Sequence, residues 1–416
     1  MIALAANSSY WQEPLNKDPL IYNAMAMDVS LGNGLVRDGK ITASIPPLYP
    51  LFLGGIYWIF GMNGLVILVF QALLGALTAV FIYRLGELLY GRGRSAAWIC
   101  GLVCVFYWPL IAIGMKILTE TLFILFLVSS AYYTLSALKE KRLGLLVPGA
   151  LLLGLATLTR SITFYLPAIV IAWLAWRWLK GKEKIYLSGI VLYAVVFIFS
   201  QTPWIVRNYM QLSAFIPTTT NTGQVLYMSN LPREGKIFGW NLRPHDLEPG
   251  QRYILALPEV ERDRALKKLA MDWWKDHPES IPRLTAYKFL YFWSPFDWEV
   301  MGRSEGVFNP WFVWVFLFAL YGVFYAERKG ELLPPLAVVL YFMAICTLSY
   351  GSPRLRLPAE PFLAIVAAGG WVAMEGRVKS GVKRNLVLLI VVITAAAGCL
   401  YSEWIKETCR KVLTWA

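Results

Sequence analysis

Two carboxylates and a group of cations, spread along the chain, have the side-chain types that a transfer from a phosphate ester needs. The carboxylates are Asp18, in NKDPLIYNAMA, and Glu120, in KILTETLFILF, and the cations are Arg160, Arg207, Lys288, Arg354 and Arg356. A carboxylate within hydrogen-bond reach of a hydroxyl or amine can take its proton as a general base. Fixed cations stabilise the charge that develops on a departing phosphate. The residues therefore fit the displacement of a phosphate, with Asp18 as the leading candidate for the base and the cations as phosphate ligands.

The acids and the first two cations also have structural explanations. Asp18 would serve equally as a solvated or helix-capping carboxylate. Glu120 begins an apolar run, where an acid complements the positive end of a helix. Arg160 and Arg207 lie beside apolar runs, where arginine side chains extend to the lipid headgroups. These four residues are candidates whose chemical and structural interpretations compete.

The later cations differ in how strongly their surroundings favour a chemical role. Lys288 stands among aromatic residues in TAYKFLYFW, a pattern typical of an aromatic belt at a membrane interface. Arg354 and Arg356 share a short turn in SPRLRLPAEP. Pro353 and Pro358 bound this turn and fix its direction, because proline restricts the backbone. The arginine pair is therefore the better candidate for the phosphate.

The composition argues against a soluble protein. Of the 416 residues, 57% are hydrophobic and only 16% are charged, whereas soluble domains are about half apolar and about a quarter charged. The formal net charge is +13, but the basic residues lie mostly in short links between apolar runs. Nucleic-acid binding would need a basic patch on a soluble face. Membrane lipids are thus expected as partners, and nucleic acid is not.

The apolar residues form runs long enough to cross a membrane, which takes about 20 helical residues each. We predict an all-α polytopic membrane protein, because lipid offers the backbone no other hydrogen-bond partners. The runs are 62–83, 95–114, 118–138, 143–159, 163–179, 186–204, 309–326, 332–350, 357–374 and 386–401. One long polar stretch, 205–305, separates the sixth run from the seventh.

Basic residues mark one side of the predicted helices. The links after the first, third, fifth, seventh and ninth runs hold most of them. Cytoplasmic loops are rich in lysine and arginine, so this side is predicted to be cytoplasmic. The opposite links, which include Lys116, Arg160 and Arg354, would then face the periplasm or exterior, together with 205–305. The site is therefore expected on the outer face of the cytoplasmic membrane.

This pattern divides the chain into four segments. Residues 1–61 would form a first external loop with interfacial helices, 62–204 an N-terminal bundle, 205–305 a large external loop, and 306–416 the last membrane helices. Residues 46–61 are apolar but short and contain three prolines, so an interfacial or re-entrant helix is expected there. A membrane helix before the first loop is expected to be missing from the chain.

The large external loop is expected to contain an amphipathic helix that starts after Pro258. The apolar residues that recur there at helical spacing are Leu266, Leu269, Ala270, Trp273 and Trp274. Charged residues lie between them, as in a helix with one apolar face. Since the loop is rich in Pro, Gly and Asn and has little apolar material of its own, we expect it to pack on the outer mouth of the helices instead of forming an independent domain.

Several motifs follow one another along the chain. Asp18 is followed by Tyr22 after four residues and by Ala26 after eight, and Thr119 precedes Glu120 in a TE pair. The longer segments are PPLYPLFLGGIYWIFG, IYRLGELLYG, GLATLTR, PWIVRNY and RLRLPAEPFLAIVAAGG. In this order they resemble the C-type glycosyltransferases of the protein mannosyltransferase and aminoarabinose transferase kind. The resemblance spans nearly the whole chain.

The resemblance implies a bundle of about ten to twelve transmembrane helices and an inverting transfer of a sugar from a polyprenyl-phosphate donor. The acceptor would be a lipid, a glycan or a protein. The resemblance makes Asp18 the general base and Glu120 the second acid, which orients the acceptor or holds a divalent ion. It assigns the donor phosphate to Arg354 and Arg356.

Two further classes of function stay open. A transporter or flippase of a lipid-linked solute could line its path with the same arginines, although the chain lacks the internal repeat common in transporters. An O-antigen ligase or polymerase also pairs a large external loop with arginines, but without a base in the first loop. The sequence identifies neither the sugar, the acceptor nor any cofactor, and a divalent cation is left open. Tyr22 and Lys116 are expected to line the substrate pocket.

Overall fold

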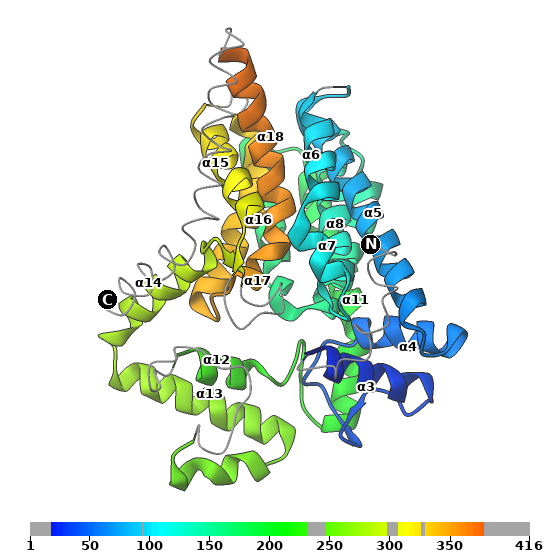
Figure 1. Ribbon diagram of the computed structural model, residues 1–416, viewed down its shortest axis with the longest axis vertical. Coiled ribbons are helices and arrows are strands. Elements are labelled where there is room, and N and C mark those ends of the chain that lie inside the picture. The colour runs from blue at the N-terminus through cyan, green and yellow to red at the C-terminus, as the bar shows by residue number, and fades with distance from the viewer. Residues whose placement is uncertain (1–17, 94, 231–246, 298–306, 326–328, 378–416) are drawn as a thin grey trace. The chain divides into compact units, whose positions relative to one another are not determined.

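The computed structural model describes residues 18–93, 95–230, 247–297, 307–325 and 329–377. Its regular structure is almost entirely helical, with two short antiparallel sheets (Figure 1). One sheet pairs β1 (Val36–Arg37) with β2 (Lys40–Ile41), and the other pairs β3 (Phe296–Asp297) with β4 (Val307–Phe308). The helical fold class predicted from the sequence is confirmed.

Six helices in the described part of the chain are long and apolar enough to cross a membrane. They cover Gly64–Tyr90, Glu120–Lys139, Ser161–Gly181, Lys184–Leu212, Gly330–Leu348 and Pro353–Glu375. A seventh span forms if Ser95–Phe106 and Trp108–Gly114, which meet at 45°, cross together, and the apolar helices Leu143–Thr159 and Pro310–Tyr325 are shorter. Each lies where a membrane run was predicted. The predicted run 386–401 falls outside the described residues.

The chain divides into two compact units. The first holds residues 1–70, 117–286 and 348–350, and the second holds 71–116, 287–347 and 351–416. Each unit therefore combines segments that are distant in sequence. The sequence predicted four consecutive segments, which is a division along the chain and not into spatial units. That division stays a prediction.

The first unit is built mainly on six helices. They are α3 (Asp18–Ser30), α4 (Leu48–Phe60), α8 (Glu120–Lys139), α9 (Leu146–Thr159), α10 (Leu166–Gly181) and α11 (Lys184–Leu212). The 3₁₀ turns Leu143–Leu145 and Ser161–Thr163 precede α9 and α10. Helix α3 packs on α4, α9 packs on both α8 and α11, and α10 packs on α11. A Cβ at Gly154 would lie 1.9 Å from Ser200 Oγ, so glycine lets α9 approach α11 this closely.

Two further helices of the first unit form a small subdomain. Helix α12 (Thr222–Asn230) packs along α13 (Glu259–Asp276), beside a 3₁₀ helix at Pro249–Ala256 (Figure 1). Their apolar core consists of Tyr227, Met228, Leu247, Ile254, Leu266 and Ala270. The helix predicted after Pro258 is confirmed, with Leu266 and Ala270 on its buried face. This stretch therefore has a small apolar core, and its packing on the helix bundle stays a prediction.

The second unit is built on the remaining helices. They are α6 (Ser95–Phe106), α7 (Trp108–Gly114), α15 (Pro310–Tyr325), α16 (Lys329–Leu348), α17 (Pro353–Arg356) and α18 (Glu360–Arg377), with a 3₁₀ turn at Leu357–Ala359. Helix α18 packs against α15 and α6. The Tyr90 hydroxyl donates to the Ile365 carbonyl oxygen at 2.7 Å. Two helices, α5 (Gly64–Tyr90) and α14 (Ser280–Phe292), run from the first unit into the second.

Candidate functional site

A buried ion pair joins the start of α8 to the end of α9. Arg160 Nη1 lies 2.7 Å from Glu120 Oε1 and donates to Thr119 Oγ1 at 3.1 Å. The Glu120 side chain is fully buried, while that of Arg160 is 17% exposed. The pair forms because α8 and α9 are packed neighbours joined by a short link, so the first turn of one meets the end of the other. Two residues that were predicted for different tasks are thus partners.

The side chain of Tyr49, from α4, connects this ion pair to α3. It is 1% exposed, and its hydroxyl has no hydrogen-bond partner among the described residues. Burial raises the pKa of Tyr49 well above its ordinary value, and Tyr22 and Glu120 lie close enough to act electrostatically in the same direction. The Tyr22 ring meets the Tyr49 ring edge to face, with centroids 5.2 Å apart. Tyr49 therefore lies near both α3 and the acid of α8.

Asp18 lies on the same face of α3 as Tyr22. Positions four residues apart are neighbours on one helix face, and Tyr22 follows Asp18 by four residues. Helix α3 is also held on α4 by Tyr57, whose hydroxyl donates to Asn23 Oδ1. The two predicted acids, Asp18 and Glu120, therefore belong to one region of the first unit. We call Asp18, Tyr22, Tyr49, Glu120 and Arg160 the acid cluster.

Arg356 is the centre of a second polar cluster, in the second unit. Its Nε donates to Glu360 Oε1 at 2.7 Å, and its Nη1 donates to the carbonyl oxygens of Phe292 and Ser294 at 2.6 and 2.8 Å. The guanidinium carbon lies 3.4 Å from the centre of the Phe312 ring. These contacts fix the end of α14 to the start of α18. In the part of the chain that the structure describes, Nη2 has no hydrogen-bond partner, so that atom is the one left for the predicted phosphate.

Lys288 and Arg354 lie in the same part of the second unit. A Cβ at Gly351 would lie 2.5 Å from the carbonyl oxygen of Lys288, so glycine permits α14 to approach the turn that leads into α17. Arg354 follows in α17, where its N–H donates to Ser352 Oγ at 3.2 Å. Lys288 is 2% exposed, and burial lowers its pKa to about 8. We call Lys288, Arg354 and Arg356 the cation cluster.

The remaining predicted residues have other surroundings. Arg207, in the last turns of α11, donates to the carbonyl oxygens of Thr42 and Leu35 at 2.8 and 3.0 Å. Its guanidinium therefore holds the chain that precedes α4. Lys116 is half-buried and belongs to the second unit. The predicted roles of Arg207 at the phosphate and of Lys116 in the substrate pocket stay predictions.

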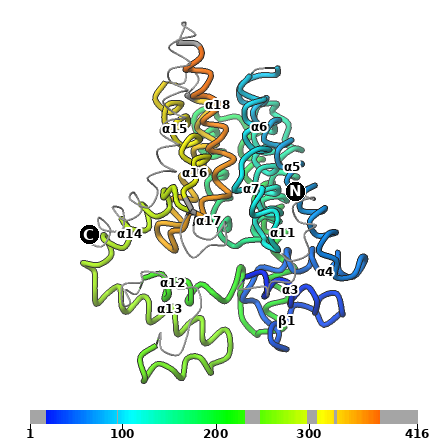
Figure 2. Tube along the Cα trace, in the orientation of Figure 1, coloured from blue at the N-terminus to red at the C-terminus, as the bar shows by residue number. Residues whose placement is uncertain are grey.

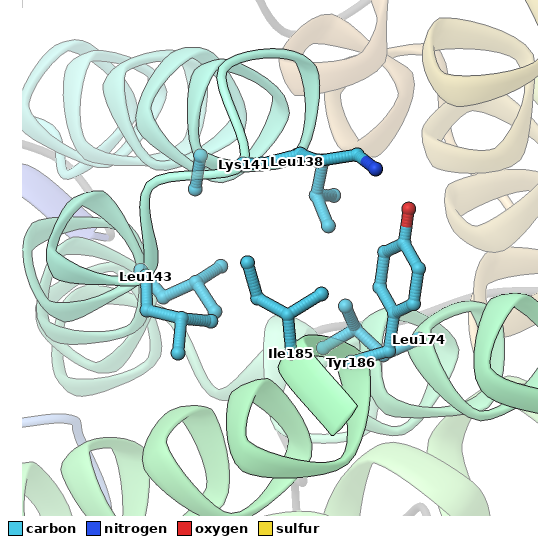
Figure 3. A pocket seen from close by; sticks show the side chains of 8 residues that line it. Leu138, Lys141, Leu143, Leu174, Ile185 and Tyr186 are labelled. Atoms are coloured by element: carbon cyan, nitrogen blue, oxygen red, sulfur yellow. The ribbon is translucent and has the colours of Figure 1, made fainter. Parts of the chain in front are cut away.

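An apolar hollow lies at the opposite end of α8 from Glu120 (Figure 3). The residues labelled around it are Leu138, Lys141, Leu143, Leu174, Ile185 and Tyr186. Its lysine is already paired, because Lys141 Nζ lies 2.9 Å from Glu183 Oε2. Leucine and isoleucine side chains offer neither a base nor a phosphate ligand, so this hollow is not the candidate site.

Sequence reasoning missed two residues, Tyr49 of the acid cluster and Glu360, the ion-pair partner of Arg356. Glu360 follows Arg356 by four residues, a helical spacing at which opposite charges pair, and this signal could have found it. Tyr49 gave no signal beyond its aromatic type within PPLYP. No group of three or more His, Cys, Asp or Glu side chains in the described ranges could hold a metal ion. A divalent ion at Glu120 stays a prediction.

The segment that contains the Glu120–Arg160 pair is similar to a known protein family. Residues 44–204 match the family model of dolichyl-phosphate-mannose-protein mannosyltransferases. Over this segment the chain is similar to that family of membrane glycosyltransferases. The match agrees with the predicted glycosyltransferase and with an integral membrane protein that has several transmembrane helices. The match contains Tyr49, Glu120 and Arg160, whereas Asp18 and the cation cluster lie outside it.

Two crystal structures of ArnT from Cupriavidus metallidurans are also similar to this chain. The apo structure has 14% sequence identity and a TM-score of 0.39, over 90% of this chain and 77% of that chain. The structure bound to undecaprenyl phosphate has 15% identity and a TM-score of 0.40, with the same coverage. No curated protein matches the chain.

Proposed function

We propose that the chain transfers a sugar from a polyprenyl-phosphate donor to a lipid, glycan or protein acceptor at the outer face of the cytoplasmic membrane. The family description names a dolichyl-phosphate sugar, which is a donor of this class. The observation that carries the proposal is the acid cluster, in which Tyr49 lies near both the α3 helix of Asp18 and the Glu120–Arg160 pair. Two acids in one region suit the deprotonation and orientation of an acceptor.

In the proposed reaction, an acceptor hydroxyl or amine attacks the anomeric carbon of the donor sugar. The new bond forms while the bond between that carbon and the phosphate oxygen breaks, and attack from the opposite side inverts the carbon. Asp18 takes the proton of the attacking group. The polyprenyl phosphate leaves with the electron pair of the broken bond. A general base of this kind contributes about 10²- to 10⁴-fold to the rate.

Glu120 orients the acceptor in this proposal, and Arg160 balances its charge. An unpaired carboxylate is costly to bury, which explains why the fully buried Glu120 has a cation at 2.7 Å. The 17% exposure of Arg160 leaves part of its guanidinium for a substrate oxygen. Tyr22 would line the acceptor side of the pocket. In the alternative version of this proposal, Glu120 holds a divalent ion instead of orienting the acceptor.

The cation cluster binds the donor phosphate in this proposal. Lys288 and Arg354 supply charge, and Arg356 supplies the donor atom Nη2. Phosphate binding at such a cluster is favourable because charge-assisted hydrogen bonds are about twice as strong as neutral ones. Arg207, whose nitrogens contact protein carbonyls, and Lys116 would contribute only through their remaining N–H groups.

The membrane arrangement belongs to the same proposal. Charged links mark one face of the predicted runs as cytoplasmic, so residues 205–305 would be external. Six or seven candidate spans lie in the described residues. With the shorter apolar helices and the run at 386–401, the bundle would reach about ten to twelve helices.

Purified full chain, incubated with a polyprenyl-phosphate sugar and a crude acceptor extract, tests the proposal. Asp18→Asn should lower the transfer rate by about 10²- to 10⁴-fold, because the amide cannot take a proton. Asp28→Asn is the matched control, since Asp28 lies on the same helix and its side chain accepts a hydrogen bond from the nearby Asn33. Unchanged transfer in Asp18→Asn would reject the base, and absence of turnover by the wild type would reject the donor class.

A further inference from the structure

Glu259, the first residue of α13, ties distant segments of the first unit together. Its Oε2 accepts a hydrogen bond from Thr42 Oγ1 at 2.6 Å, and its Oε1 accepts one from the Ala43 backbone N–H at 2.8 Å. Thr220 Oγ1 also donates to Oε1. The Thr220 N–H donates in turn to the Ala43 carbonyl oxygen at 3.1 Å. Both carboxylate oxygens are therefore used to hold the chain at residues 42–43.

Arg207 holds the same stretch of chain. Its Nη1 donates to the Thr42 carbonyl oxygen and its Nη2 to the Leu35 carbonyl oxygen. Ala43 is fully buried in an apolar cluster between these contacts. Glu259 lies close enough to Arg207 to stabilise its charge. The network thus contains one carboxylate and one guanidinium, and removal of either leaves the other without its counter-charge.

The stretch held in this way, residues 35–43, lies between the two N-terminal helices of the acid cluster. It contains β1 and β2, and β1 packs on α3, the helix of Asp18 (Figure 2). Helix α4, which carries Tyr49, begins five residues after Ala43. A shift of residues 42–43 would therefore be passed to the helices of both Asp18 and Tyr49.

A helix-capping role does not account for the contacts of Glu259. A capping side chain accepts hydrogen bonds from the N–H groups of its own helix, and an acid in the first turn also complements the positive helix end. The N-terminus of α13 has no side-chain cap hydrogen bond, and the Glu259 oxygens bind other segments. Glu261 lies in the same turn and is exposed, so it could serve the helix end equally well.

We propose that Glu259 is a positioning residue for the general base. It sets where α3 presents Asp18, and it makes the α12–α13 subdomain part of the transfer machinery. This inference rests on the proposed function. Because a displacement of about 1 Å can cost about 100-fold in rate, loss of the carboxylate should lower kcat. The KM for the donor should change little, since the proposed phosphate ligands belong to the cation cluster.

Three variants of the full chain test the inference: Glu259→Ala, Glu259→Gln and the matched control Glu261→Gln. The measurements are kcat, the donor KM, the melting temperature and hydrogen exchange of the amides at 36–43. Glu259→Ala should lower kcat about 10- to 100-fold with the donor KM within about twofold, and amide exchange should rise about tenfold or more. Glu259→Gln should restore most of kcat, because its amide oxygen can accept from Ala43 and its amide N–H can donate to the Thr42 hydroxyl.

Wild-type kcat in Glu259→Ala would overturn the inference, and so would a raised donor KM with kcat unchanged. Unchanged amide exchange in that variant would overturn the holding role without any turnover measurement. If the wild type transferred no sugar, the positioning role would fall together with the base. If Glu259→Ala does not fold, Thr42→Val takes its place, because it removes one hydrogen bond of the same carboxylate and should lower kcat about threefold to tenfold.

Discussion

Two buried ion pairs of the described residues, Glu120–Arg160 and Arg356–Glu360, have the same N–O distance of 2.7 Å but different surroundings. Arg356 and Glu360 are almost completely enclosed, and the arginine also holds two backbone carbonyls. Arg160 is partly exposed, and its partner lies near the Tyr49 hydroxyl, which has no hydrogen bond within the described ranges. Most donors of Arg356 are used by the protein, so its pair mainly holds the fold and leaves Nη2 for the proposed phosphate. A pair with an exposed edge and an unused hydroxyl nearby can receive a substrate.

Removal of Arg356 should lower the stability of the folded protein, because its ion pair holds the fold. Arg356→Ala leaves Glu360 buried without its cation, which should cost about 3–5 kcal/mol of the free energy of unfolding. Denaturation of the purified protein in detergent measures this loss. The double variant Arg356→Met with Glu360→Leu should regain most of it, because apolar side chains of similar size need no partner. If Arg356→Ala were as stable as the wild type, this pair would have no structural role.

Substitution of Glu120 should act on turnover more than on stability. Glu120→Gln keeps the size of the side chain and an oxygen that accepts from Arg160, but it loses the charge. Because a misplaced acceptor can cost about 100-fold, we expect the transfer rate to fall about 100-fold and the free energy of unfolding to fall by about 1–2 kcal/mol. Glu140→Gln, at the other end of α8, is the control, because its exposed pair with Arg142 is worth about 0–1 kcal/mol. A rate for Glu120→Gln equal to that of the control would remove Glu120 from the proposed site.

The membrane helices could be predicted from the sequence because length and hydropathy decide whether a helix can span. The ion pairs are a harder case. Glu120 and Arg160 could be placed at the same side of neighbouring runs, but they are forty residues apart, and which cation meets which acid depends on side-chain packing. Arg356 and Glu360 are four residues apart, a spacing at which helical side chains pair, so this pair could have been predicted from the sequence. The contacts of Glu259 were not, because they join loops that carry no periodic pattern.

Lys288, a titratable residue of the second unit, makes phosphate binding at the cation cluster testable by pH. Burial lowers its pKa from 10.5 to about 8. If the charged amine binds the donor phosphate, the donor KM should rise about tenfold between about pH 7 and pH 9 as the proton is lost. Lys288→Arg should abolish this dependence, because arginine stays charged throughout the range. A donor KM that is the same at both pH values in the wild type would exclude Lys288 as a phosphate ligand.

The stability linked to Lys288 should change in the opposite direction. Between about pH 8 and pH 10.5 the unfolded chain binds more protons at this residue than the folded chain does, so the free energy of unfolding should rise with pH. The measurement is the pH dependence of the melting temperature of the wild type against that of Lys288→Met. Equal slopes in the two proteins would contradict the lowered pKa.

Tyr49→Phe is the smallest change and tests whether the unused hydroxyl has a chemical role. The ring and its edge contact with Tyr22 remain, and only a buried hydroxyl without a described partner is lost. Because such a group costs about 1–3 kcal/mol to bury, the variant should be as stable as the wild type or more stable. If the hydroxyl binds a polar atom of the substrate, the transfer rate should fall about threefold to tenfold. Tyr57→Phe is the contrast, because it removes the hydroxyl that donates to Asn23 and should lower stability. If Tyr49→Phe turned over as fast as the wild type, the hydroxyl would have no chemical role. The Glu120–Arg160 pair would then differ from the Arg356–Glu360 pair only in its exposure.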